Sequence, residues 1–570
     1  MYSKLTNKLT NKQKTIPWLI IKNWRICSFC GYTFSLIFII FMIFMILILS
    51  SFVILEKLTI QIEKKIHFPT KKRLTISIDP RMDHNDDKNI SKPNCSTYID
   101  NGFGNCSNLF WFAVTAVVLG GAFQHGYSMA VVANTIPMFQ HKFNSSDLYI
   151  SAIVSGMAAG GLAGALLAGY FADKLGRKNA IILNSLPLVI GWCLMAAAPY
   201  DYRQILLVGR IVTGFGVGAG SGLTNIFLSE ISPVKIRGFI GTLYGIFLSI
   251  GSLVALLLSM PSVIGDTDNG FRLVFAFPIL FVLLQVAILL ACPEPPSYLA
   301  LLKHDIRAAT NSLSQYRKVR VKEEEDELKH GDAQKYQYEL TFTDLIRDSG
   351  HRLALIIGII LHCSQQLSGI TAVISYTPAI FEEANVADPA LATVWTGLVN
   401  VFAGIAAALI SDRIGRRSLL IGGVIVLILA QTGLAVSQAC NMNTTWSCKG
   451  DWTGDIAMAS VLTYIAGFAA SLGSVIWLYV SEITAAEARG KSTSICISVN
   501  WGLALVVMFA YDSVEKAIRP YTFFLFASIL TVCLILVIFL MPETRKKNVK
   551  LVTEEIKKQA ANFPPTVFFG

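Results

Sequence analysis

The sequence predicts an all-α membrane protein with twelve transmembrane helices in two pseudo-symmetric six-helix halves, plus one extra N-terminal apolar helix. Composition, apolar stretches and an internal repeat support this fold class. Of the 570 residues, 53% are hydrophobic and 15% are charged, whereas a soluble domain carries about a quarter charged residues. This composition excludes a disordered chain, and the 11 cysteines are too sparse for a disulfide-built scaffold.

The apolar stretches give the number of spans, because a membrane-crossing helix needs about 20 mostly apolar residues. Thirteen stretches qualify, at 31–55, 110–132, 149–171, 181–199, 205–227, 238–260, 271–292, 353–377, 394–411, 418–438, 456–480, 493–513 and 521–541. Glycines such as Gly156, Gly160 and Gly164 lie at the spacing that lets helices pack closely in lipid.

The basic residues predict the orientation of the twelve spans that start at residue 110. Loops on one side hold 26 Lys and Arg residues, and loops on the other side hold six. Because cytoplasmic loops carry the excess of Lys and Arg, both ends of the twelve-helix unit are predicted to be cytoplasmic. The net charge of +11 therefore reflects membrane orientation, and we expect no nucleic-acid partner.

An internal repeat divides the unit into two halves. The segment Ser229–Gly238 recurs as Ser481–Gly490, 252 residues later, and Asp173–Lys178 recurs as Asp412–Arg417. A Pro-Glu pair also follows the last helix of each half. The predicted domains are a leader (1–109), two six-helix halves (110–299 and 352–545), a cytoplasmic linker (300–351) and a cytoplasmic tail (546–570).

The repeated charges predict a cytoplasmic gate. Carboxylates and arginines at helix ends can pair when that face is closed and separate when it opens. The candidate residues are Asp173, Arg177, Arg210, Glu230, Arg237, Asp412, Arg416, Glu482 and Arg489. Arg210 lies inside a span, where a charge needs a partner, and Glu230 and Glu482 are the expected partners. The alternative is that these charges serve only as topological anchors.

The predicted outside loops carry two glycosylation acceptors, Asn144 and Asn443. Cys440 and Cys448 share the loop of Asn443. A disulfide between them and two unpaired thiols are both open, because spacing alone does not show pairing.

The leader conflicts with this topology. If the Lys-rich start of the chain is cytoplasmic, the helix at 31–55 would place the next segment outside and invert the unit. We therefore hypothesise that residues 1–81, before Met82, are a gene-model extension or a dispensable leader. The orientation of 31–55 stays open.

No phosphate-binding loop, metal-ligand cluster or nucleophile–base pair occurs in the sequence. We expect no cofactor, no metal, no nucleotide partner and no enzymatic activity.

The ordered motifs resemble the sugar porter family of the major facilitator superfamily, and within it the facilitative glucose transporters. The resemblance runs from about 110 to 545. It rests on Phe123–Tyr127, Gly169–Arg177, Gly209-Arg210, Pro293–Pro296, Gln365–Ile370 and Pro542–Thr544. It implies a midplane site between two halves that rock to alternate access.

The resemblance also implies the sugar-contacting residues. These are Gln365, Gln366, Asn400, Trp477 and Asn500 with its neighbour Trp501, and Gln124 and Thr371 are added as further candidates. Amides donate and accept, which suits the hydroxyls of a neutral polyol, and an indole offers a flat apolar face. The alternative is that buried amides only bond neighbouring helices.

Several positions depart from the glucose-transporter pattern. In the span at 238–260, Gly245 stands where those transporters have a glutamine. In the span at 353–377, Thr371 replaces an asparagine, and in the span at 456–480, Ser471–Ser474 replaces paired prolines before Trp477. The triplet before the double glutamine is His362-Cys363-Ser364. These departures keep two alternatives open: a porter for another polyol (fructose, inositol or a disaccharide), and a non-transporting sugar sensor if the span at 456–480 cannot bend.

The position that carries an Asp in proton-coupled sugar porters is Ser128. A hydroxyl cannot carry a proton through a transport cycle, so we expect uncoupled transport; His125 is the one nearby group that titrates near neutral pH. The sequence thus predicts facilitated transport of a hexose, with glucose preferred, across the plasma membrane. The expected partners are the sugar and the lipid bilayer.

Overall fold

The computed structural model describes residues 105–561, apart from 234, 266–267, 319–323, 325–341, 442–451, 486–487, 546 and 548. The predicted helix at 31–55, the hypothesis on residues 1–81, and the predicted sites at Asn443 and Cys448 lie outside the described residues. Met1–Cys106 and Ser107–Gly570 are separate compact units, and the helices below belong to the second unit.

The described secondary structure is helical, as the sequence predicts. The long and short helices of the first half are α3 (Asn108–Val117), α4 (Phe123–Ala130), α5 (Ile136–His141), α6 (Asp147–Leu175), α7 (Arg177–Ala197), α8 (Gln204–Ile231), α9 (Arg237–Leu258) and α10 (Asp268–Ala291). A π-helical turn joins α3 to α4 at Val118–Ala122, so the first span continues through both.

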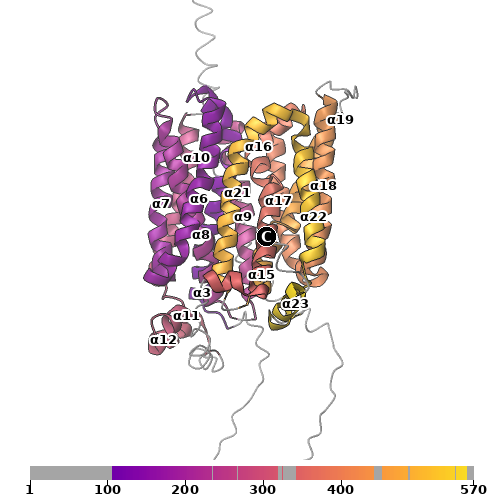
Figure 1. Ribbon diagram of the computed structural model, residues 1–570. Helices are drawn as coiled ribbons and strands as arrows, with labels where there is room; N and C mark the ends of the chain where they lie inside the picture. The colour runs from indigo at the N-terminus through magenta and orange to yellow at the C-terminus, as the bar shows by residue number, and fades with distance from the viewer. Residues whose placement is uncertain are drawn as a thin grey trace, which may run out of the picture. The chain divides into compact units, whose positions relative to one another are not determined.

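The second half repeats this arrangement. Its helices are α15 (Ser349–Leu367), α16 (Ile370–Glu383), α17 (Pro389–Ile414), α18 (Arg416–Asn441), α19 (Trp452–Ala470), α20 (Val475–Ile483), α21 (Arg489–Ile518) and α22 (Thr522–Leu540). The long helices of both halves lie side by side along one direction (Figure 1).

The predicted number of spans is confirmed in the described part of the chain. Eleven helical segments there are long and apolar enough to cross a membrane. The last segment, Gly490–Leu540, contains α21 and α22 in succession, which makes twelve spans. Large apolar side chains such as Leu166, Leu290 and Phe539 remain exposed on these helices, as expected where lipid is the solvent.

Glycine determines how closely the helices of the first half approach. A methyl group at Gly160 or Gly164 of α6 would overlap backbone atoms of α8. Small residues at a helix interface let two backbones come into contact in lipid. The pairs α6–α21 and α9–α17 bring the two halves together.

Short helices gather at one end of the bundle. These are α11 (Pro296–Leu301), α12 (Ile306–Tyr316), α14 (Phe342–Arg347) and α23 (Val549–Ala561). We call this the basic end, because it holds the loops with the excess of Lys and Arg, and it is the end predicted to be cytoplasmic. Tyr316 donates to the Pro293 carbonyl at 2.8 Å, and burial raises the pKa of Tyr316, which keeps this hydroxyl a donor.

Two predicted continuous spans are broken helices. The span predicted at 353–377 is interrupted at Ser368 and Gly369, where Gly369 has a left-handed φ of 79° that suits glycine. The span predicted at 456–480 is interrupted at Ser471–Ser474, between α19 and α20. Broken helices in membranes expose backbone polar groups only where protein or a polar cavity satisfies them, so these breaks mark the interior of the bundle.

Candidate functional site

Three amide side chains predicted to bind sugar are brought together next to the two helix breaks. Gln366 Nε2 donates to Asn500 Oδ1 at 2.9 Å. Asn500 Nδ2 donates to Gln365 Oε1 at 2.7 Å. All three side chains are buried. The structure therefore joins the end of α15 to the middle of α21, as a shared binding site requires.

The break between α19 and α20 contributes a backbone group to this cluster. Gln365 Nε2 donates to the carbonyl of Leu472 at 2.9 Å. His362, one turn before Gln366, places Nδ1 at 3.1 Å from Asn500 Nδ2. The ring of His362 also meets the ring of Trp477 edge to face, with 5.1 Å between their centroids.

Three buried polar atoms of the predicted sugar-binding residues and of Trp501 have no hydrogen-bond partner among the described residues. They are Gln366 Oε1, Thr371 Oγ1 and Trp501 Nε1. An unpaired buried donor or acceptor is costly, and in a native site such atoms call for a ligand or water. Together they offer both acceptors and a donor.

Trp501 lies where the two halves meet. Its ring stacks on His125 of α4 with 5.2 Å between centroids, and a methyl group at Gly161 of α6 would collide with it. His125 is held in turn by the Tyr244 hydroxyl at 2.9 Å. A ligand at the amide cluster would thus lie next to a contact between halves.

The other predicted sugar contacts differ in their surroundings. Asn400 and Trp477 are half-buried, and Thr371 follows the break after α15. Both polar atoms of the Gln124 side chain bond residues of the first half. Its Nε2 donates to the Pro278 carbonyl at 2.8 Å, and its Oε1 accepts from Trp192 Nε1 at 2.9 Å. Its predicted role in sugar binding is untested.

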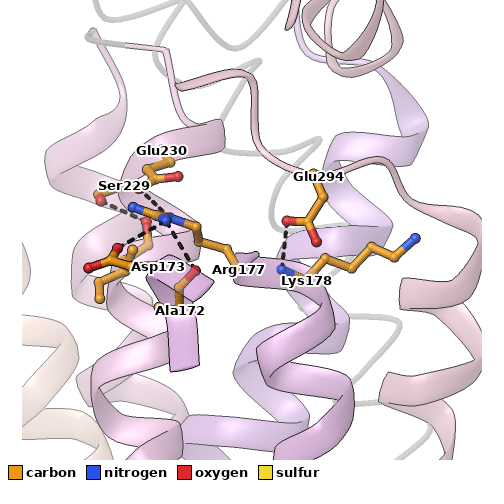
Figure 2. Close-up of polar contacts among 8 residues, drawn as sticks. Ala172, Asp173, Arg177, Lys178, Ser229, Glu230 and Glu294 are labelled. Carbon is orange, nitrogen blue, oxygen red and sulfur yellow. Dashed lines mark hydrogen bonds and ion pairs between the residues drawn. The ribbon is translucent and has the colours of Figure 1, made fainter. Parts of the chain in front are cut away.

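A charge cluster lies at the basic end of the first half (Figure 2). Arg177 Nε lies 2.9 Å from Glu230 Oε1, and Arg177 Nη1 lies 3.2 Å from Asp173. Glu294 accepts from the backbone N–H groups of Lys178 and Asn179 at 2.9 and 3.1 Å. A carboxylate there suits the N-terminus of α7.

The second half carries the matching cluster. Arg416 lies 3.3 Å from Glu482, and the Thr544 hydroxyl donates to Glu482 at 2.6 Å. Glu543 accepts from the backbone N–H of Arg416 at 3.1 Å. The predicted gate residues Asp412 and Arg489 lie in helices whose side chains there are outside the described set. Arg237 donates to the Ser232 carbonyl at 3.4 Å.

The expected partners of Arg210 were wrong. Its guanidinium donates to the Ser128 carbonyl at 2.7 Å and to the Ser128 hydroxyl at 3.1 Å, and it also bonds the carbonyl of Ile153. Arg210 lies two turns from the start of α8 at Gln204, far from Glu230 at the basic end. Carbonyls and a hydroxyl can satisfy a buried guanidinium without a carboxylate, so Arg210 is no part of the gate cluster.

The ion pairs of the two basic-end clusters lie each within one half. An ion pair between halves lies at the opposite end of the bundle, where Lys516 of α21 is 2.5 Å from Asp147 of α6. The same Lys516 is 3.0 Å from Asp512. Sequence reasoning did not identify this pair, and no repeat or motif marks it.

The sequence analysis also missed the roles of His362, Glu294 and Glu543. The two glutamates were visible as a repeated Pro-Glu pair, but only the fold shows that they cap helices. Cys440 is disulfide-bonded; its predicted partner Cys448 lies outside the described residues. Asn144, the predicted glycosylation acceptor, is exposed.

The fold and site define a multi-pass membrane transporter. The family model described as sugar (and other) transporter matches residues 113–556, and this chain belongs to that family. It is 32% identical over 426 residues to facilitated glucose transporter protein 1 of Caenorhabditis elegans, covering 73% of this chain and 82% of that protein.

A second relative and a solved structure are also similar to this chain. The human solute carrier family 2, facilitated glucose transporter member 3, is 28% identical, with 79% of this chain and 92% of that protein covered. The inward-open structure of the xylose transporter XylE from E. coli matches with a TM-score of 0.64 at 21% identity, covering 78% of this chain and 99% of that chain. That structural match shows the shared fold. The chain is a transporter and not an enzyme.

Proposed function

We propose that this protein carries a hexose, with glucose as the preferred substrate, down its concentration gradient across the plasma membrane. The observation that carries the proposal is the buried, uncharged amide cluster of Gln365, Gln366 and Asn500, in which Gln366 Oε1 has no partner among the described residues. Amides pair with hydroxyls as donors and acceptors, so the cluster suits a neutral polyol. The names of the glucose-transporting relatives support this substrate class.

The proposed transport mechanism is alternating access, and the contacts between the two halves support it. A methyl group at Gly397 of α17 would touch Leu253 and Leu256 of α9, toward the end opposite the basic end. Along the same face of α9, a methyl group at Gly245 or Gly241 would meet no atom within 4 Å. We infer a state in which the site is open toward the basic end, which we place in the cytoplasm.

Uncoupled transport follows from Ser128. Arg210 donates to the Ser128 hydroxyl and carbonyl, so its charge is satisfied without a titratable partner there. Uptake is then expected to be independent of the proton gradient.

The test is uptake of radiolabelled glucose by hexose-transport-null cells that express the intact chain. Saturable uptake that is insensitive to an uncoupler is expected. The variant Gln366→Leu should weaken saturable uptake about tenfold, as the loss of one hydrogen bond predicts, whereas Gln204→Leu, an exposed position at the start of α8, should leave it unchanged. Surface-expressed protein without saturable uptake of glucose would overturn the choice of sugar.

A second candidate is a porter for another polyol. Gly245 leaves space where glucose transporters have a glutamine, and Thr371 replaces an asparagine. Competition by fructose, inositol and disaccharides distinguishes this candidate. The sensor alternative rested on a span at 456–480 that cannot bend, but the α19–α20 break at Ser471–Ser474 exists without prolines, which weighs against it.

A further inference from the structure

We propose that the three amides form a one-way hydrogen-bond relay whose direction is set by the Leu472 carbonyl, so that Gln366 meets the substrate as an acceptor. This inference rests on the proposed function and deepens it. It assigns His362 as a positioning residue for the same site. It also states which hydrogen-bonding role a substrate hydroxyl must play there.

The Leu472 carbonyl has only one possible hydrogen-bonding role, that of an acceptor. The oxygen and nitrogen of a side-chain amide look alike, so the orientation follows from the partners. A backbone carbonyl can only accept. Leu472 lies in the break between α19 and α20, and its oxygen is 2.9 Å from the Gln365 amide. Gln365 must therefore turn its NH₂ group toward Leu472.

The orientation of each further amide follows from the one before. With its NH₂ on Leu472, Gln365 offers Oε1 to Asn500, which must present Nδ2 at 2.7 Å. Asn500 then presents Oδ1 to Gln366, which must present Nε2 at 2.9 Å. Turning any single amide around would set two oxygens or two NH₂ groups against each other.

The relay ends at Gln366 Oε1. This oxygen is buried and has no partner among the described residues, and Gln366 is only 7% exposed. A buried acceptor is costly until a donor reaches it. The relay thus presents an oxygen to the site, and a substrate hydroxyl must donate to it.

His362 holds the middle of the relay. Asn500 Nδ2 has two hydrogens; one goes to Gln365, and the other points to His362 Nδ1 at 3.1 Å. Nδ1 must then be the unprotonated nitrogen, so His362 is neutral with its proton on Nε2. Because His362 also packs against Trp477, it ties α20 and α21 to the same arrangement.

The experiment replaces sugar hydroxyls one at a time in competition against glucose uptake by the intact chain. A deoxy sugar lacks the hydroxyl, and a deoxyfluoro sugar keeps a weak acceptor but cannot donate. At one ring position or more, we expect the fluoro and deoxy sugars to compete equally poorly, about tenfold more weakly than glucose, as the loss of one hydrogen bond predicts. The variant Gln366→Met should lose this discrimination.

Two variants separate the roles of His362. His362→Phe keeps a ring beside Trp477 and removes the acceptor for Asn500, so the ratio between glucose and the sensitive fluoro sugar should fall. His362→Asn places an oxygen near the position of Nδ1 and should restore the ratio. A purely structural role would lower uptake without moving this ratio.

The outcomes are distinguishable. Glucose uptake with fluoro sugars competing as well as glucose at every position would show that the site presents a donor, which overturns the relay. An unchanged ratio in His362→Phe would remove His362 from it. Absence of any saturable hexose uptake would instead overturn the proposed function, and the relay with it.

Discussion

Two glycines begin the repeated charge clusters, and each has a backbone conformation that other residues avoid. Gly176 and Gly415 have φ values of 100° and 102°. A methyl group at either would press against the carboxylate of Glu294 or Glu543. The tight turn lets each carboxylate reach the first N–H groups of the next helix. Gly176 and Gly415 were recognised as part of a repeat, but nothing in their motifs indicated that their φ is positive.

Replacing Gly176 with Ala should destabilise the protein by about 1–3 kcal/mol, the cost of a strained backbone position. The thermal unfolding midpoint of the solubilised protein measures this effect. Gly169→Ala in α6, where a methyl group meets no atom within 4 Å, is the matched control and should not lower the midpoint. Equal midpoints for the two variants would contradict the argument.

Ser128 offers a second prediction, because Arg210 donates to both of its oxygens. Ser128→Asp would place a titratable carboxylate on a buried guanidinium. Uptake should then rise severalfold when the external pH falls from about 7.5 to about 5.5, since a carrier carboxylate must be protonated to cross. Uptake by the unmodified chain should stay unchanged over this range.

The control is Ser128→Asn, which has a similar size and cannot titrate. Both variants are measured with and without an uncoupler. If Ser128→Asp responds to pH no more than Ser128→Asn does, the carboxylate does not couple transport to protons.

Two helix breaks lie beside the candidate site, although the sequence predicted continuous helices there. Hydropathy predicts each broken helix as one span, because a break of two to four residues barely changes the mean hydropathy over about twenty residues. The α19–α20 break is stabilised by hydroxyls: Ser471 donates to the Gly467 carbonyl, and Ser474 donates to the Ala469 carbonyl, both at 2.6 Å. These bonds satisfy backbone groups that a broken helix leaves free.

A variant with Ser471→Ala, Gly473→Ala and Ser474→Ala should straighten this span, because alanine favours a continuous helix and cannot donate to those carbonyls. The transport rate should fall about tenfold. Glucose binding should also weaken, because the Leu472 carbonyl that orients Gln365 lies in this break. Uptake and ligand-dependent thermal stabilisation measure the two properties.

The matched control is Ser528→Ala with Thr531→Ala in α22, whose hydroxyls bond carbonyls of an unbroken helix. It should leave both properties unchanged. If the triple alanine variant transports normally, the break is not needed for the transport cycle.

Across the bundle, the described basic-end pairs Arg177–Glu230 and Arg416–Glu482 each join helices of one half, whereas the described pair Asp147–Lys516 joins the two halves at the opposite end. The basic-end pairs Arg177–Glu230 and Arg416–Glu482 are partly buried, whereas Asp147 and Lys516 are 55% and 45% exposed. An exposed pair contributes about 1 kcal/mol at most. That is enough to bias a balance between two conformations of similar free energy.

Asp147→Asn should therefore shift the population toward states open at the end opposite the basic end, by up to about fivefold. Distances between spin labels at Leu148 and Ile518, in a background without other reactive cysteines, measure the shift. High salt should reduce the difference from the unmodified chain.

Asp512→Asn is the control for this variant. It removes the contact of Lys516 within α21 and keeps the contact between halves. If the two variants give the same distance distribution, the Asp147–Lys516 pair does not hold the halves together at that end.

The twelve spans, the repeated basic-end charges and the amides that the structure brings together were all predictable from the sequence. These follow from local properties, because apolar length and motif spacing can be read along the chain. The partners of Arg210, the two helix breaks and the proposed direction of the amide relay depend on tertiary contacts and could not be predicted. Gln365 and Leu472 lie 107 residues apart, and Gln365 and Asn500 lie 135 apart. A hydrogen bond depends on distances of a few ångströms between such segments, and packing alone sets those distances.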